Sequence, residues 1–437
     1  MSETLGVIGL GYVGLPLAVQ AAEKGYDVTG VDLNQDLVNM VNSRESPYVN
    51  DERFNTAFRS VGLASLRATT AYDALQDADN IVVCVPTPTE NNVPDISYVT
   101  KAATQIGNLL RTGHFVSLES TVNPGVTRDE VLPILEERSG LVVGRDFHLA
   151  HCPERIDPGN KQFFVGNLNR VVGGITPECT ERAVGFYSKV VDAEIIPLGS
   201  TEEAEFVKSW ENSHRNVMIA LANSAAIICD AMGMNIDKVL GGLQSKVDQF
   251  GLQLAKPGIG PGGHCIPEDI HYVIKKARQN GIDTRFLDDA AELNDKMPRY
   301  AVGQLSEMIK AQGEKIGDLN VGLMGLAYKP NIADMRRSPS VEVGYHLMRK
   351  AKSVAVHDPF VTADANAIRG ALVMPTLEET LEYSDALFIG TAHEEYLQGL
   401  TAQLLAKAGI RYVLDGRNCL DKGSILDAGI QYQGIGK

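Results

Sequence analysis

Short apolar runs alternate with stretches of helical periodicity in the first part of the chain. Pro16–Lys24 carries a helical pattern, and apolar runs predict strands at Leu5–Ile8, Tyr26–Val31, Ile81–Val85 and Phe115–Leu118. Strands separated by helices are typical of a parallel sheet with helices on its faces. The stretch Ser200–Met232 contains no Gly or Pro and is rich in helix formers, so it predicts one long helix.

The same alternation resumes after Gly317. Apolar runs there predict strands at Asn320–Gly325, Ser353–Val356, Ala386–Ile389 and Tyr412–Leu414. Asp32 and Asp358 each end the second strand of their half, which is a weak internal repeat. We therefore expect an α/β protein with two Rossmann-like, doubly wound parallel-sheet domains joined by a long central helix. The expected domains are 1–199, a central helical region 200–300, and 301–437.

Composition narrows the class of protein and its partners. The chain has 437 residues, too many for one core, with 44% hydrophobic and 22% charged residues, as in soluble globular proteins. The net charge of −15 argues against nucleic acid and anionic membranes as partners. No apolar run is long enough to span a membrane and no signal peptide is evident, so a cytoplasmic protein is expected. Six scattered cysteines indicate reduced thiols, with neither disulfides nor a metal site.

A glycine-rich turn follows the first predicted strand. Gly9, Gly11 and Gly14 lie in the motif GLGYVG, which opens the first helix. Such glycines let a pyrophosphate approach the backbone at a helix N-terminus. Asp32, at the end of the second strand, can bind a ribose 2′-hydroxyl and would repel a 2′-phosphate, which favours NAD over NADP. The alternative is a glycine turn without a ligand.

Cys265 stands in a second glycine-rich loop, GGHCIPED. Pro267 suits the first turn of a helix, so Cys265 is predicted just before a helix N-terminus, where the helix dipole favours a thiolate. Asp269 should lie one turn further on, and Gly262 and Gly263 leave room for a substrate near the backbone. A buried cysteine beside a tight turn is the alternative.

Three weaker patterns carry candidate polar groups. Lys208 and Asn212 are four residues apart on the long helix, which suits an oxyanion site, although a solvated polar face among Glu202, Glu203, Glu205 and Glu211 explains them as well. The segments Glu119–Gly125 and His151–Arg155 follow predicted strands, where open sheets bind ligands or simply turn. Lys329 and Arg417 also end strands and could hold phosphate, or be ordinary surface cations.

Together these segments resemble the UDP-glucose/GDP-mannose dehydrogenase family. The resemblance runs from Gly6 to about Asn418 and rests on seven ordered motifs: GLGYVGLP, STVxPG, PER, KxxxN, GGHCIP, GLAYKPxxxDxRxSP and DGR. It implies an NAD domain, a central helix that makes a homodimer or higher homo-oligomer, and a C-terminal domain that binds a UDP-sugar. The predicted central helix is apolar on two faces, at Phe206, Val207, Trp210, Val217, Met218, Leu221 and Ile227.

The resemblance also assigns roles. Cys265 matches a catalytic nucleophile, Lys208 and Asn212 an oxyanion-stabilising pair, and Asp269 with Thr121 residues that order a catalytic water. Glu154 matches a glutamate near the reacting carbon and is a candidate general base. The expected NAD-binding residues are Gly9, Gly11, Tyr12, Val13, Gly14, Asp32, Thr87, Thr121 and Arg336. The expected substrate-binding residues are Glu154, Arg155, Lys208, Asn212, Gly262, Lys329 and Arg417.

The sequence departs from the UDP-glucose branch of the family. Pro153-Glu154-Arg155-Ile156-Asp157-Pro158-Gly159 replaces PEFL, and Glu268 replaces a lysine, which resembles the branch acting on UDP-N-acetylhexosamines. The implied reaction is a four-electron oxidation of C6 with two NAD, through a Cys265 thiohemiacetal and thioester. Alternatives are a UDP-glucose 6-dehydrogenase, a single-step β-hydroxyacid dehydrogenase, which needs no such cysteine, and a non-catalytic NAD-dependent sensor.

Overall fold

A computed structural model describes residues 3–48, 52–62, 64–90, 93–156, 162, 164–250, 254–263, 265–361 and 368–437. The chain forms two compact units, Met1–Glu211 (unit 1) and Asn212–Lys437 (unit 2). The division falls inside the long helix α7 (Thr201–Met232). Two parts of the predicted motifs, Asp157–Gly159 and His264, lie outside the described residues.

Unit 1 is built on one twisted sheet. Among its described residues, eight strands are hydrogen-bonded in the order β10-β9-β8-β7-β4-β1-β2-β3, and β9 is the strand that runs antiparallel to its neighbour β8. These strands are β1 (Thr4–Ile8), β2 (Asp27–Val31), β3 (Leu66–Thr69), β4 (Asn80–Val83), β7 (Phe115–Leu118), β8 (His148–His151), β9 (Arg170–Gly174) and β10 (Ile195–Pro197). A short hairpin, β5 (Thr89–Glu90) with β6 (Val93–Pro94), stands apart from this sheet.

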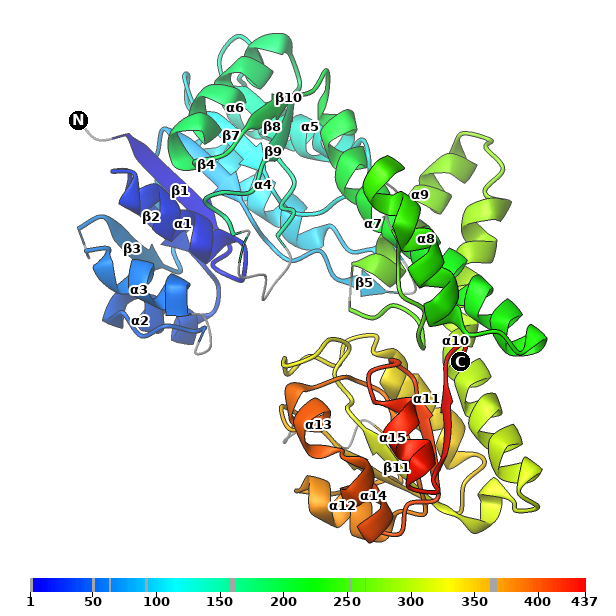
Figure 1. Cartoon of the computed structure of the whole chain (residues 1–437). Coiled ribbons are helices and arrows are strands. Elements are labelled where there is room, and N and C mark those ends of the chain that lie inside the picture. Colours follow the sequence, from blue (N-terminus) through cyan, green and yellow to red (C-terminus); the bar gives the residue numbers. More distant parts are fainter. Residues whose placement is uncertain are drawn as a thin grey trace. The chain divides into compact units, whose positions relative to one another are not determined.

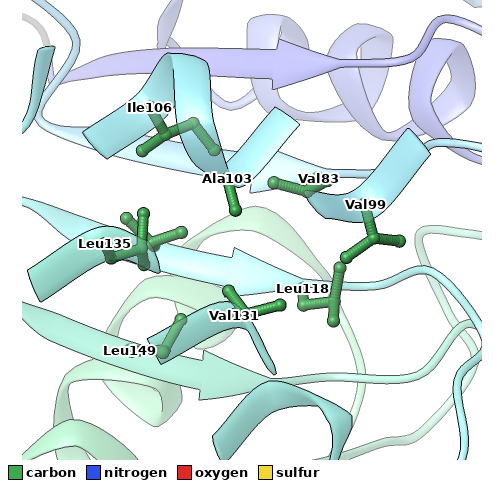
Figure 2. A pocket seen from close by; sticks show the side chains of 9 residues that line it. Val83, Val99, Ala103, Ile106, Leu118, Val131, Leu135 and Leu149 are labelled. Atoms are coloured by element: carbon green, nitrogen blue, oxygen red, sulfur yellow. The ribbon is translucent and has the colours of Figure 1, made fainter. Parts of the chain in front are cut away.

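Helices cover both faces of this sheet (Figure 1). They are α1 (Gly14–Glu23), α2 (Gln35–Ser43), α3 (Glu52–Ser60), α4 (Ser97–Leu109), α5 (Leu132–Ser139) and α6 (Pro177–Val190), with short turns η1 (Tyr72–Leu75) and η2 (Thr127–Val131). The strands bury side chains on both faces: Val7 and Val82 pack toward α1 and α6, whereas Ile8 and Val83 pack toward α4 and α5. Figure 2 shows apolar side chains alone around the gap between α4, α5 and the sheet, so this gap belongs to the core.

Unit 2 repeats the design with a smaller sheet. Its described residues form six parallel strands in the order β13-β12-β11-β14-β15-β16. They are β11 (Asn320–Met324), β12 (Ser353–His357), β13 (Leu372–Val373), β14 (Ala386–Ile389), β15 (Tyr412–Asp415) and β16 (Gln431–Gly434).

The helices of unit 2 fall into two groups. One group precedes the sheet in sequence: the second half of α7, α8 (Ile236–Phe250), α9 (Ile266–Gln279) and α10 (Arg285–Ala311), followed by the turn η3 (Ile316–Asp318). The other group connects the strands: α11 (Pro339–Met348), α12 (Leu377–Tyr383), α13 (Glu394–Gly399), α14 (Ala402–Lys407) and α15 (Lys422–Asp427). Side chains of α10 and α11 cover one face of the sheet and those of α12 to α15 the other.

The two Rossmann-like units and the long helix confirm the predicted fold class. Every strand predicted from an apolar run is present, and its ends differ from the prediction by no more than two residues. The runs were recognisable because these central strands are buried on both faces, which removes polar residues from them. Among the described residues, no helix is long and apolar enough to cross a membrane.

Candidate active site

The glycine-rich turn between β1 and α1 has the geometry that a dinucleotide needs. Gly9 has φ +89°, and a Cβ there would lie 2.5 Å from the carbonyl oxygen of Cys84. A Cβ on Gly14 would lie 1.9 Å from the oxygen of Gly9, so both positions require glycine. Gly11 is exposed with open space beside it, at the N-terminal end of a helix that no side chain caps. This turn can therefore receive a pyrophosphate, as NAD would supply.

Asp32 follows β2 and faces the same turn. Its Oδ2 accepts a hydrogen bond from the backbone N–H of Leu10 at 2.8 Å, and its Oδ1 accepts from Asn34 N–H at 2.9 Å. The carboxylate is half-buried, so it keeps acceptor capacity for ribose hydroxyls. Tyr12 is 73% exposed and stacks on Tyr48 with ring centroids 4.8 Å apart. Unit 1 thus has the donors and acceptors to bind NAD, and Val13 lies half-buried in the same turn.

The loops after β4 and β7 carry two further predicted NAD contacts. Thr87 and Thr121 are half-buried in these loops. The Ser120 hydroxyl donates to the carbonyl oxygen of Val85 at 2.8 Å and so ties one loop to the other. Since both loops leave the carboxyl ends of neighbouring parallel strands, they lie at the sheet edge where open α/β folds bind ligands.

Glu154 belongs to a buried network of charges that the sequence did not predict. Arg170 Nη2 donates to Glu154 Oε2 at 3.2 Å, and Arg170 Nη1 donates to Glu119 Oε1 at 2.9 Å. Glu154 Oε1 accepts from the backbone N–H groups of Arg155 and Ile156, both at 2.6 Å. Burial raises the pKa of Glu119 despite the nearby guanidinium. Both oxygens of Glu154 are therefore held by donors, which makes it a fixed acceptor more than an uncommitted base.

Arg155 is also paired within unit 1. Its Nε donates to Glu211 Oε2 at 3.0 Å, its Nη2 forms an ion pair with the other oxygen of Glu211, and its Nη1 donates to the carbonyl oxygen of Asn169 at 3.3 Å. A substrate anion bound by Arg155 would have to compete with the Glu211 carboxylate. Its predicted role in substrate binding stays a prediction.

The acidic residues that precede Lys208 on α7 do not form a uniform solvated face. Glu203 is exposed, but Glu205 is fully buried and binds the loop after β7. Periodicity in the sequence does not reveal this, because Thr201 and Ser209, which lie one turn away on the same buried face, are polar as well. Lys208 itself is half-buried one turn after Glu205.

Trp210, which the sequence left unexplained, stacks on Phe206 with ring centroids 5.4 Å apart and is 46% exposed.

In unit 2, Cys265 is the residue immediately before α9, as predicted. The helix begins at Ile266 with Pro267 in its first turn, and the backbone N–H of Asp269 donates to the carbonyl oxygen of Cys265 at 2.9 Å. The Asn212 side chain on α7 donates to Asp269 Oδ2 at 2.6 Å in a buried contact. The structure therefore brings Asn212 and Asp269 together beside the turn that begins with Cys265.

Cys265 differs from the other cysteines in its surroundings. Burial raises the pKa of Cys84 well above its usual range and that of Cys152 to about 12. Cys179 and Cys229 are also buried, whereas Cys265 is half-buried, as is Cys419. Arg336 lies within electrostatic reach of Cys265, although its guanidinium is held first by Asp334 at 2.6 Å. A cation beside a thiol favours the thiolate.

The loop that precedes Cys265 packs against two later loops of unit 2. A Cβ on Gly262 would lie 2.6 Å from Tyr328 Cβ, and Gly263 N–H donates to the carbonyl oxygen of Arg336 at 3.1 Å. Position 262 therefore requires glycine because of packing within the protein. From the sequence alone, we expected glycine there to leave room for a substrate. A Cβ on Gly258 would lie 3.6 Å from Arg417 Nη1.

Arg417 is a buried cation that the protein leaves partly unsatisfied. Its Nε donates to the carbonyl oxygen of Gly390 at 2.7 Å, but its Nη2 is buried and has no acceptor among the described residues. Burial lowers the pKa of this guanidinium to about 10. A buried donor without a partner is costly, so an anionic ligand at this position would relieve that cost.

Lys329 lies in a loop, 325–331, that two strand ends hold. Asp358 Oδ2 accepts from the backbone N–H groups of Leu326 at 2.7 Å and Ala327 at 2.9 Å, and from His393 Nε2 at 3.1 Å. His393 Nδ1 accepts from Asn331 N–H at 3.0 Å. Asp358 thus occupies the position that Asp32 has in unit 1, but its carboxylate is buried and accepts its hydrogen bonds from the protein itself. Lys329 is half-buried within this fixed loop.

Each unit therefore gathers its own part of the predicted site. The predicted NAD residues other than Arg336 lie in unit 1, as do Glu154 and Lys208. Unit 2 contains the predicted NAD residue Arg336 together with Cys265, Asn212, Asp269, Lys329 and Arg417. No group of three His, Cys, Asp or Glu side chains in the described ranges could hold a metal ion. One unit has a turn that can receive a dinucleotide. The other has a cysteine at a helix N-terminus and a buried arginine. These features are those of an NAD-dependent dehydrogenase with a second, anion-binding domain.

Comparisons with known proteins make this class specific. The NAD binding domain of the UDP-glucose/GDP-mannose dehydrogenase family matches residues 3–191, its central domain residues 202–296, and its UDP binding domain residues 322–422. The chain belongs to the UDP-glucose/GDP-mannose dehydrogenase family. It is an NAD-dependent oxidoreductase of the nucleotide-sugar dehydrogenase class.

Individual relatives cover nearly the whole chain. The UDP-N-acetyl-D-mannosamine dehydrogenase of Pyrococcus horikoshii is 30% identical over 99% of both chains. The UDP-N-acetyl-D-glucosamine 6-dehydrogenase of Pseudomonas aeruginosa is 33% identical over 94% of this chain and 97% of the relative. A solved structure of the UDP-N-acetyl-D-mannosamine dehydrogenase from Pyrococcus horikoshii matches with a TM-score of 0.89, at 30% identity, over 99% of both chains.

Proposed function

We propose that this enzyme oxidises the C6 alcohol of a UDP-N-acetylhexosamine to a carboxylate, with Cys265 as a covalent nucleophile. The observation that carries the proposal is the position of Cys265. It is a half-buried thiol at the N-terminal end of α9, with Arg336 within electrostatic reach and the Asn212–Asp269 pair beside the same helical turn. Two of the other thiols, Cys84 and Cys152, are buried and have raised pKa values, which removes them from such chemistry.

The cysteine makes the second oxidation possible. NAD, when bound, supplies the hydride acceptor. The first oxidation turns the alcohol into an aldehyde, and the Cys265 sulfur then forms a bond to the carbonyl carbon, giving a thiohemiacetal. That carbon still carries one hydrogen, which leaves as hydride in the second oxidation, so a thioester remains on Cys265. Water attacks the thioester and the carbon–sulfur bond breaks, which gives the carboxylate product and the free thiolate and releases the two protons of the water molecule.

The other polar residues would act around this carbon. We assign Lys208 and Asn212 to the C6 oxygen, where positive charge and an amide N–H stabilise an oxyanion. Asp269, with Thr121, would orient the hydrolytic water. Glu154 remains the candidate general base, but its bonds to Arg170 and two backbone N–H groups favour a role as a fixed negative charge and acceptor.

The diphosphate of the substrate would be held in unit 2. Arg417 offers a buried, unpartnered Nη2, and Lys329 lies in the loop fixed by Asp358 and His393. The N-acetylhexosamine is inferred from the residues that depart from the UDP-glucose branch and from the activities that the relatives' names give. Those names include both C2 epimers, glucosamine and mannosamine.

The test is to incubate the purified protein and NAD with a panel of UDP- and GDP-sugars and to count the NADH formed per sugar consumed. We expect two NADH per UDP-N-acetylhexosamine. One NADH per substrate would indicate the single-step hydroxyacid dehydrogenase. No NADH with any sugar would indicate a non-catalytic sensor and would overturn the proposal. Preference for UDP-glucose would keep the chemistry and change the sugar.

We also propose that the protein works as a homodimer or higher homo-oligomer. Helix α7 exposes large apolar side chains in unit 2, with Leu221 63%, Ile228 51% and Met232 67% exposed, and α8 exposes Val239 and Leu243. Exposed large apolar side chains along a helix are typical of a surface that a second copy covers.

A further inference from the structure

The start of α7 is fastened to the loop that follows β7, and one side chain makes this connection. Glu205 Oε2 accepts a hydrogen bond from the backbone N–H of Gly125 at 2.6 Å. Its Oε1 accepts from the backbone N–H of Thr127 at 2.8 Å and from the Thr127 hydroxyl at 2.6 Å. The Glu205 side chain is fully buried. Three short bonds to one buried carboxylate are more than a helix needs for its own stability.

These bonds connect two predicted parts of the active site. The loop 119–127 carries Thr121, and α7 carries Lys208 less than one turn after Glu205. On its other side, the loop is tied to the end of β4 through Ser120 and Val85. Gly125 has φ +102°, a left-handed conformation that aims its N–H at the carboxylate.

We propose that Glu205 is a positioning residue that sets Thr121 relative to Lys208 for the oxidation at C6. The inference rests on the proposed function for the roles of those two residues. The hydrogen bonds of Glu205 lie within unit 1 and do not depend on the proposed function. Glu205 touches neither substrate nor cofactor in this proposal and acts through the loop alone.

The chemistry of the three partners explains why a carboxylate stands here. Both backbone groups are obligate donors, so the ideal partner has two acceptor oxygens and no hydrogen of its own. A glutamine would keep one acceptor but point its NH2 group at a backbone N–H. Burial raises the pKa of Glu205 to about 7, although the bonds from Thr127 and Gly125 oppose this shift. Below that pH the protonated acid would lose part of its acceptor capacity.

Charged residues flank Glu205 on α7. Glu202, one turn earlier on α7, contributes to the raised pKa, and it is itself paired with Arg128 of η2 at 2.9 Å. Lys208 follows on the next turn of the same helix. The Glu202–Arg128 pair bridges the same two elements but is partly exposed, so it offers a matched control at the surface.

The experiment compares Glu205→Gln with Glu202→Gln in the full-length enzyme. We expect Glu205→Gln to lower kcat at least tenfold while KM for NAD and for the UDP-sugar change less than about threefold. The wild-type kcat should fall as pH drops below about 7, and this limb should be absent from Glu205→Gln, which cannot titrate. Glu202→Gln should keep the wild-type kcat and the acidic limb, which should move only to lower pH because Glu202 contributes to the raised pKa of Glu205.

A readout without turnover separates this inference from the proposed function. Hydrogen exchange at the Gly125 and Thr127 amides should be at least tenfold faster in Glu205→Gln than in the wild type, and unchanged in Glu202→Gln. Unchanged exchange, or an unchanged kcat in an active enzyme, would overturn the role of Glu205 and leave the proposed function intact. If the wild type reduces no NAD with any sugar, the proposed function fails. Unchanged amide exchange in Glu205→Gln would then by itself reject the role of Glu205 in fixing the loop 119–127. Thermal unfolding of each variant checks that kcat is measured on folded protein.

Discussion

At the scale of single residues, burial separates Cys265 from the thiols of the two cores. We expect Cys265→Ala to form no uronic acid, because an aldehyde that has not been captured cannot lose a second hydride. Cys265→Ser should be nearly as inactive, since a hydroxyl is a far weaker nucleophile at neutral pH, and it could accumulate a sugar ester on the enzyme. A product assay of the Ala variant and mass spectrometry of the Ser variant measure these outcomes.

Cys419 provides the matched control for this prediction. It is half-buried like Cys265, but its Sγ donates to Asp415 and its pKa is raised by burial and by that carboxylate. Cys419→Ala should therefore keep its turnover. Normal four-electron oxidation by Cys265→Ala would remove the covalent mechanism and leave Cys265 as a structural residue.

Asp32 should decide between the two nicotinamide cofactors. Its carboxylate lies half-buried beside the glycine turn and would repel a 2′-phosphate. Asp32→Ser should weaken NAD binding about tenfold or more and reduce the preference over NADP, and Asp32→Arg should favour NADP further. Steady-state kinetics with both cofactors would measure this. A wild-type enzyme that used NAD and NADP equally would contradict the assignment.

The sequence predicted the role of a residue where a local motif or a backbone constraint marks it. It did not do so where the role depends only on contacts with distant segments. Gly9, Gly14 and Cys265 stand in turns whose local sequence already fixes the geometry. Glu119 and Glu205 look like ordinary surface acids in sequence, because their donors come from segments 51 and 78 to 80 residues away. Arg170 was missed for the same reason. Long-range pairing of buried charges leaves no local pattern.

At the scale of elements, the strand-end loops of unit 2 should carry the affinity for the nucleotide. We expect Lys329→Ala and Arg417→Ala each to raise KM for the UDP-sugar at least tenfold, the loss expected for a charged hydrogen bond of about 1.5–3 kcal/mol. Affinity for NAD should stay within about twofold, because unit 1 carries the dinucleotide turn. Calorimetric titration with UDP and with NAD checks both. An equal loss of NAD affinity would place these cations in the other site.

The loop 325–331 should make unit 2 sensitive to acid. Burial alone would raise the pKa of Asp358, but bonds from His393 and from the backbone N–H groups of Ala327 and Phe360 hold it at about 2. A carboxyl pKa below its unfolded value stabilises the fold at pH above that value, and this stability is lost as pH falls toward 2. The contribution is about 2 kcal/mol at neutral pH, with roughly half remaining at pH 3.

Urea unfolding of the wild type and of Asp358→Asn measures this contribution. We expect the variant to be less stable by about 2 kcal/mol at pH 7 and the difference to shrink as pH falls to 3. Asp385→Asn is a suitable control, because that carboxylate also accepts a backbone N–H, from Asn320, but is partly exposed. A difference that did not change with pH would show that the charge of Asp358 is not what stabilises the loop.

The elements that were predicted are those with a strong local signal. The fully buried strands and the uninterrupted α7 were evident from apolar runs and the absence of breakers. The antiparallel β9 was not, because its sequence RVVGG has only two apolar side chains between an arginine and two glycines. The two-residue β13 was also missed, because so short a strand is defined by its partner strand and not by its own pattern. The π-helical turn η2 likewise depends on its surroundings.

At the scale of the whole molecule, self-association should depend on α7 and α8. We expect Leu221→Asp to shift the protein from dimer or higher oligomer to monomer, since it places a charge within an apolar interface. Sedimentation velocity at micromolar concentration measures this, with Glu203→Ala, an exposed change near the start of α7, as the control. A wild-type protein that is monomeric and active at working concentration would contradict the prediction.

The fixed loop around Lys329 has a consequence for the enthalpy and entropy of substrate binding. Asp358, His393 and Thr391 already restrict the backbone of residues 325–331 before any ligand arrives. Ordering one residue costs about 1–2 kcal/mol in conformational entropy, and here that cost has been met during folding. Binding of UDP to unit 2 should therefore show a small entropic penalty for loop ordering and a favourable enthalpy from the charged contacts. Rigidity gained in folding is thus converted into affinity for the nucleotide.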